Sequence, residues 1–114
     1  MDTVCIKIKI RNDSLHEVRE WFKTLTERSD ETIKTLENEK VSIESIFLDE
    51  IDGEESFIIY FMKATDLSYA YEIAKKSTAA IDIYHKECKK KFFGEKKQLE
   101  LLANFDLNDV IRQT

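Results

Sequence analysis

Residues 41–64, VSIESIFLDEIDGEESFIIYFMKA, decide the fold of this chain. Residues 41–48 and 56–64 are rich in β-branched and aromatic side chains, which is typical of strands. The polar stretch between them contains Asp52-Gly53, a pair that favours a tight turn. The sequence therefore predicts two consecutive strands joined by a turn.

A strand and a long helix are expected before this pair. Residues 4–10 alternate apolar and mostly polar side chains, the two-residue period of a strand with one buried face. Apolar residues then recur at steps of three and four from Leu15 to Leu36, which predicts one helix of about seven turns. Ser14 and Glu17 have the spacing of a capping box at its start.

Two helices and a final strand are expected after the pair. Asp66 is placed to cap a helix that begins at Leu67, and a further helix is expected over residues 79–92. Alternating apolar side chains predict a last strand over residues 99–107. This order of elements favours a single α+β domain over residues 1–114, a ferredoxin-like βαββαβ fold with an antiparallel sheet and helices on one face.

Composition and charge exclude several function classes. The formal net charge of −5 disfavours nucleic acid as a partner, because phosphate contacts need clustered Lys and Arg. No apolar run approaches the ~20 residues of a membrane span. Cys5 and Cys88 lack metal-ligand spacing and fit a reducing compartment. We therefore expect a cytoplasmic protein with no membrane, nucleic-acid or metal partner.

One basic patch brackets Phe92 and Phe93. Basic residues beside aromatic ones can bind single-stranded nucleic acid, but they also offset the dipole at a helix C-terminus. Given the acidic total, we interpret the patch in the second way. Its members are Lys86, Lys89, Lys90, Lys91, Lys96 and Lys97.

The predicted topology leaves one sheet face without helices. Alternation along the strands places on this open face Cys5, Lys7, Lys9, Ser42, Glu44, Ile46, Leu48, Ile58, Tyr60 and Met62. An apolar patch of this size is seldom left in water, so a second copy of the chain is expected to cover it as a homodimer. The same side chains either form a plain dimer interface or line a partly polar small-molecule cavity.

His85 is the main candidate for chemistry. It shares a helix face with Ile81 and Cys88, and Asp82 lies three residues before it, close enough to orient the imidazole. We expect Asp82 to orient His85 as a base or ligand donor. The alternative is a half-buried structural histidine.

Four residues are predicted to bind a ligand beside His85. Glu44 would accept a proton, or else pair with Lys7 or Lys9 across the sheet. Tyr60 would donate a hydrogen bond to the ligand, or else pack in the interface. The predicted ligand-binding set is Glu44, Tyr60, Lys7 and Tyr84.

Two motifs resemble a family of small, uncharacterised bacterial proteins. They are Glu31-x-x-x-Thr35-Leu36-x-x-Glu39-x-Val41-x-x-Glu44-Ser45-x-Phe47-Leu48 and Ser77-x-x-x-Ile81-Asp82-x-Tyr84-His85. The family is similar in fold to the dimeric α+β barrel superfamily, which includes monooxygenases, haem-degrading enzymes and isomerases. The haem-degrading branch would assign roles to Asn12, Trp21 and His85, but Asn12 follows the first strand and Trp21 lies on the first helix, which departs from that branch.

Residues and resemblance together predict a homodimeric small-molecule-binding protein. Its activity would be that of a cofactor-free monooxygenase or an isomerase, and no cofactor is expected. The alternative is a structural or regulatory dimer without catalysis.

Overall fold

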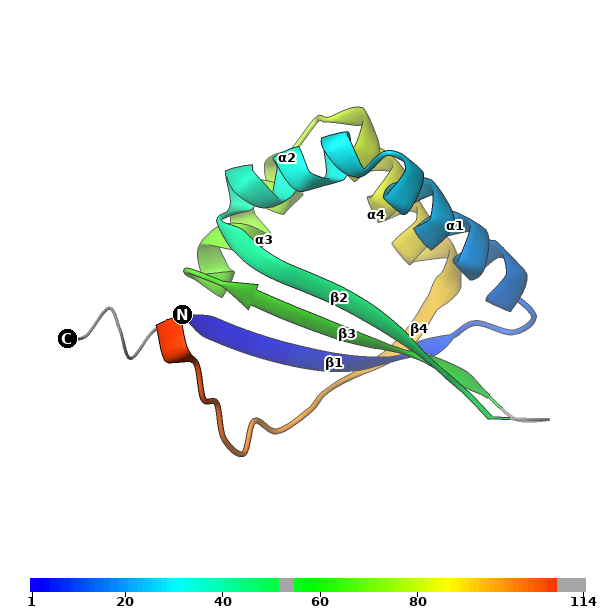
Figure 1. The fold of residues 1–114 in the computed structure, drawn as a ribbon. Helices are drawn as coiled ribbons and strands as arrows, with labels where there is room; N and C mark the ends of the chain where they lie inside the picture. The colour runs from blue at the N-terminus through cyan, green and yellow to red at the C-terminus, as the bar shows by residue number, and fades with distance from the viewer. Residues whose placement is uncertain (52–54, 109–114) are drawn as a thin grey trace.

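The computed structural model describes residues 1–51 and 55–108. Its elements are β1 (Asp2–Ile10), α1 (Leu15–Glu27), α2 (Ser29–Glu39), β2 (Val41–Glu50), β3 (Ser56–Ala64), α3 (Leu67–Lys76), α4 (Ala80–Phe92) and β4 (Phe93–Gln98). The helices cover one face of the sheet and leave the other open (Figure 1). The turn predicted at Asp52-Gly53 lies outside the described residues.

The sheet has four strands in the order β2-β3-β1-β4, and each neighbouring pair is antiparallel. β1 and β3 are therefore central, with β2 and β4 at the edges. This confirms the predicted α+β class, with an antiparallel sheet and helices on one face.

The strand register corrects which side chains of β2 and β3 face the helices. Directly opposed residues of antiparallel strands share a face. Ile6 of β1 lies opposite Tyr60, and Tyr60 lies opposite Ile46. Cys5, Lys7 and Lys9 are on the open face as predicted. The following residues, predicted for the open face, instead lie under the helices: Glu44, Ile46, Leu48, Ile58, Tyr60 and Met62.

The physical reason for this error is that β3 is apolar on both faces. A one-residue slip exchanges the two faces of a strand, and here hydrophobicity does not distinguish them. In β2, the pairing also shifts between Val41 and Ile43, where one extra residue interrupts the ladder. Val41 is consequently buried, whereas Ile43 is 46% exposed on the open face.

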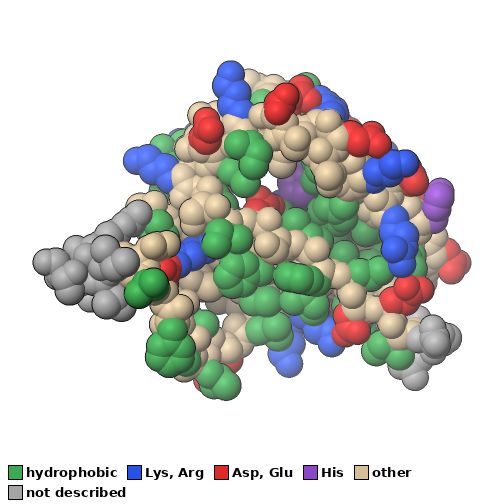
Figure 2. Space-filling model, viewed as in Figure 1, with side chains coloured by type: hydrophobic (Ala, Val, Ile, Leu, Met, Phe, Trp, Pro, Cys, Tyr) green, Lys and Arg blue, Asp and Glu red, His purple; other side chains and the backbone are tan. Residues whose placement is uncertain are grey.

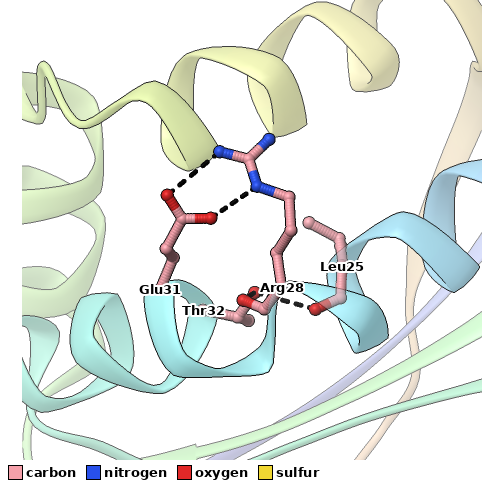
Figure 3. A network of polar contacts seen from close by, with 4 residues as sticks. All are labelled: Leu25, Arg28, Glu31 and Thr32. Atoms are coloured by element: carbon pink, nitrogen blue, oxygen red, sulfur yellow. Dashed lines mark hydrogen bonds and ion pairs between the residues drawn. The ribbon is translucent and has the colours of Figure 1, made fainter.

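The predicted long helix is two helices that meet at Arg28. Arg28 has φ −101° and ψ 38°, outside helical values. The Thr32 hydroxyl donates to the Leu25 carbonyl across this break at 3.1 Å, and the Arg28 guanidinium pairs with Glu31 at 2.5 and 3.1 Å (Figure 3). A hydroxyl inserted into the backbone ladder bends a helix, so α1 and α2 arch over the sheet (Figure 1).

The predicted helix caps differ in outcome. The Asp66 side chain accepts from the Tyr69 N–H at 3.2 Å, which confirms the cap of α3. The Ser14 hydroxyl instead donates to the Asn12 carbonyl at 3.3 Å and makes no cap bond. The capping box predicted for Ser14 and Glu17 is therefore not formed.

The last strand lies earlier than predicted. β4 follows α4 directly and pairs with β1, whereas residues 99–106 have no strand pairing. β4 has a mostly polar sequence, so the pattern of alternating apolar residues did not predict it. An edge strand such as β4 is held by backbone hydrogen bonds to its neighbour and can have polar side chains. We name residues 99–108 the C-terminal segment. It lies along the open face, where Leu99 donates to the Cys5 carbonyl at 2.9 Å and Asp106 forms an ion pair with Lys63.

The hydrophobic core has two parts. The larger part surrounds Trp21, which is 1% exposed, and joins α1 and α4 to the sheet. The smaller part contains Val41, Ala64 and Ala70 beneath α2 and α3. The cavity described next takes lining residues from both parts.

Candidate functional site

A cavity of about 1020 Å³ lies between the helices and the sheet. Its lining on the sheet side includes Glu44, Ile46, Leu48, Ile58, Tyr60 and Met62. The break between α1 and α2 contributes Leu25 and Thr32 to the opposite side, and α4 contributes His85 and Lys89. Figure 2 shows this hollow between the helices and the sheet, with a histidine and an acidic side chain inside it. The arch of α1 and α2 therefore leaves room for a guest molecule.

His85 is held in the cavity wall by two aromatic side chains. Trp21 Nε1 donates a hydrogen bond to His85 Nδ1 at 3.1 Å. His85 Nε2 lies 3.3 Å from the Tyr60 hydroxyl. Trp21 comes from α1, His85 from α4 and Tyr60 from β3, so this chain of contacts ties both helices to the sheet.

The environment keeps the His85 imidazole neutral. Burial lowers the pKa of His85 to about 3, and the nearby charge of Lys89 acts in the same direction. A neutral ring also suits Trp21, because the indole N–H only donates and needs an acceptor nitrogen. Both ring nitrogens are thus engaged, which leaves His85 no free lone pair with which to act as a base.

Charged groups from α2, β2 and α4 line the same cavity. Burial raises the pKa of Glu44, although the charge of Lys89 opposes this shift. Burial, with the charges of Asp82 and Glu44, raises the pKa of Glu39 to about 7. Burial lowers the pKa of Lys89, whose ammonium lies 5.8 Å from the centre of the Tyr60 ring. The cavity thus combines an apolar lining with carboxyl groups that bind protons more readily than usual.

The structure brings some of the predicted site residues together and separates others. His85, Asp82, Glu44 and Tyr60 all line the cavity. Asp82, however, accepts a hydrogen bond from Ser77, and the nitrogens of His85 are taken by Trp21 and Tyr60. The predicted orienting role of Asp82 is therefore corrected, because an aromatic pair holds the ring.

Lys7 and Tyr84 lie away from this site. Lys7 is on the open face, 4.3 Å from the centre of the Phe57 ring. Tyr84 packs against the core cluster of Trp21 and is not part of the cavity lining. Asn12, considered for haem chemistry, is exposed in the β1–α1 turn.

Lys89 and Glu39 line the cavity but were not predicted as site residues. The hydrogen bond between Trp21 and His85 was not predicted either. Lys89 was assigned to the basic patch, yet it lies four residues after His85 and so on the same helix face. Glu39 ends α2 and is only partly buried, and a pattern of apolar residues gives no signal for such a position. Within residues 1–51 and 55–108, no group of three or more His, Cys, Asp or Glu side chains is placed to hold a metal ion.

Comparison with known protein families gives a match for this chain. The profile of DUF6176, described as a family of unknown function, matches residues 1–110. The chain belongs to this family. No curated protein matches this chain.

Two of the solved structures that resemble this chain are designed proteins. The designed protein Ferredog-Diesel is 18% identical, with a TM-score of 0.50, over 87% of this chain and 85% of its own. The solution NMR structure of the designed protein LFR1 1, with ferredoxin fold, is 18% identical, with a TM-score of 0.53, over 94% of each chain. These neighbours establish the ferredoxin-like fold. In the described part of the chain, no helix is long and apolar enough to cross a membrane.

Proposed function

We propose that this protein binds a small, largely apolar molecule in the cavity between its helices and its sheet. The observation that best supports this function is the lining of the cavity, which is mostly apolar but includes the polar side chains of Tyr60, His85, Glu44 and Lys89. Ligand sites typically have about 300–1,000 Å³ of space, apolar walls and a few polar groups that orient the ligand. The volume of about 1020 Å³ suits a ligand of this kind.

The apolar lining also favours an apolar ligand. Such a molecule would cover apolar side chains of the hollow and remove them from water. Because the ligand binds the folded protein and not the unfolded chain, its binding is expected to raise the thermal stability of the fold.

A thermal-shift screen with a matched pair of variants tests this function. The screen covers aromatic ketones, quinones, phenols, aromatic acids, flavins and haem. Ala74 lines the cavity, whereas Ala80 is exposed at the start of α4. A ligand should stabilise wild type and Ala80→Phe but not Ala74→Phe, in which the added ring occupies the space. Stabilisation of all three proteins alike would contradict binding in this cavity.

Glu44 is the residue best placed for catalysis. With its pKa raised by burial, it suits an isomerase-like reaction, in which its carboxylate removes a proton from the carbon beside a carbonyl and returns it to the same framework. The step needs no cofactor, because one proton moves and no electron is lost. Deuterium exchange into 2-tetralone, followed by NMR, should be accelerated by wild type and not by Glu44→Gln. Equal rates in both proteins would favour binding without catalysis.

We also infer that a second copy of the chain covers the open face. Phe47 and Ile43 are 60% and 46% exposed there. The C-terminal segment adds Leu102 and Phe105, which are 89% and 95% exposed. Exposed apolar side chains on both the sheet and the segment are of the kind that a two-fold dimer interface buries.

A further inference from the structure

The chain of contacts Trp21–His85–Tyr60 determines where its hydrogens lie. The indole N–H of Trp21 is a donor only, so His85 Nδ1 accepts and carries no hydrogen. A neutral imidazole then carries its hydrogen on Nε2. His85 Nε2 accordingly donates to the Tyr60 oxygen, which lies 3.3 Å away. The hydroxyl of Tyr60 is therefore the acceptor in this pair.

The hydrogen of the Tyr60 hydroxyl is left to point elsewhere. Tyr60 is 6% exposed and forms part of the cavity lining. Because Tyr60 lines the cavity, an acceptor on a bound molecule could take this hydrogen bond, and such an acceptor would be favoured over an apolar group at this position. The Lys89 ammonium, 5.8 Å from the centre of the Tyr60 ring, also favours an oxygen that carries partial negative charge.

We infer that Tyr60 donates a hydrogen bond to an acceptor oxygen of the ligand, and that Trp21 is the positioning residue that fixes this direction through His85. The inference rests on the proposed function and names the ligand class. The ligand is an apolar compound that carries an acceptor oxygen, such as that of a ketone, quinone or phenolate. A ligand whose polar group only donates hydrogen bonds would find no partner at Tyr60.

A pair of probes of the same shape tests this preference. 2-Acetonaphthone carries a carbonyl, and 2-isopropenylnaphthalene has a C=CH2 group in its place. Wild type should bind the ketone at least about fivefold more tightly than the alkene. Tyr60→Phe should bind both probes equally. Equal binding by wild type would overturn the inference and leave the proposed function standing, whereas no binding of either probe would overturn both.

The tautomer of His85 gives a second readout that needs no ligand. Nitrogen-15 NMR of wild type should show the form with hydrogen on Nε2, and observation of the Nδ1 form would overturn the inference. Trp21→Phe removes the indole N–H that donates to His85 Nδ1. Both tautomers of His85 should then appear, and the preference for the ketone over the alkene should fall. A purely structural role of Trp21 would lower the affinity for both probes by the same factor. If Trp21→Phe does not fold, the wild-type spectrum still decides.

Discussion

Glu39 shows how burial acts on a single acid. Its pKa is about 7 in the folded protein against an ordinary value of 4.5. Between pH 4.5 and 7 the folded state therefore binds more protons than the unfolded state. The contribution of Glu39 to the free energy of unfolding is thus most favourable below pH 4.5 and is lost as the pH rises through 7. The last turn of α2, where the carboxylate meets the negative end of the helix dipole, is also an unfavourable place for it.

Replacing Glu39 should stabilise the protein at neutral pH. We expect Glu39→Gln to raise the free energy of unfolding by about 2 kcal/mol at pH 8 and to have almost no effect at pH 4. Urea denaturation at both pH values measures the difference. Glu37→Gln, on the exposed side of the same helix, serves as the control and should have little effect at either pH. A gain from Glu39→Gln of the same size at pH 4 would refute the assignment.

His85 should give the opposite pH dependence. Its folded pKa of about 3 lies below the ordinary 6.5, so the unfolded state binds more protons between these values. The contribution of His85 to the free energy of unfolding is therefore fully present above pH 6.5 and falls as the pH is lowered toward 3. Relative to His85→Gln, wild type should lose about 2 kcal/mol of unfolding free energy between pH 7 and pH 4. Parallel pH profiles of the two proteins would mean that His85 titrates normally.

At the scale of single elements, the end of α2 is strained. Lys40 has φ 56° and ψ 38°, the left-handed conformation, and its N–H bonds to the last carbonyls of the helix. Glycine adopts this conformation without the steric cost of a side chain. Lys40→Gly should therefore stabilise the protein by about 0.5–1 kcal/mol. Thermal unfolding measures the change.

Lys34 in the same helix provides the matched control. It is exposed in the middle of α2, where glycine has no conformational advantage. Lys34→Gly should destabilise the protein by about 1 kcal/mol. If both substitutions destabilise the protein equally, the left-handed end of α2 is not a source of strain.

The sequence predicts the existence of elements better than their ends and faces. The periodic patterns of apolar residues were sufficient to predict β1, β2, β3, α3 and α4, because each of these elements has an apolar side that must be buried. The break at Arg28 was not predictable, because the apolar residues keep their helical spacing from α1 into α2. The bend is associated instead with the hydrogen bond from the Thr32 hydroxyl to the Leu25 carbonyl. β4 was missed because its backbone pairs with β1 while its side chains remain polar.

The candidate site illustrates the same limit. His85 was found from its helix face and Tyr60 from its strand, but their contact depends on the register between strands and on how α4 crosses the sheet. No spacing along the chain links Trp21 to His85, which lie 64 residues apart. Three-dimensional packing, rather than local pattern, therefore determines the direction of each hydrogen bond.

At the scale of the whole molecule, the open face should determine the oligomeric state. Ile43 on the open face and Ile83 on α4 are 46% and 44% exposed, so the same substitution can be compared on two sides of the molecule. Light scattering after size exclusion should give a dimer mass for wild type and Ile83→Asp, and a monomer mass for Ile43→Asp. A monomer mass for wild type would contradict the covered face.

The central claim is that the cavity beneath α1 and α2 holds a small apolar ligand. Nuclear Overhauser effects between bound 2-acetonaphthone and the protein test it most directly, because they report which side chains touch the probe. We predict contacts to Ile46, Ile58 and Met62, which line the cavity. Contacts confined to Ile43 and Ile59, on the open face, or no contact at all at saturating probe, would contradict the claim.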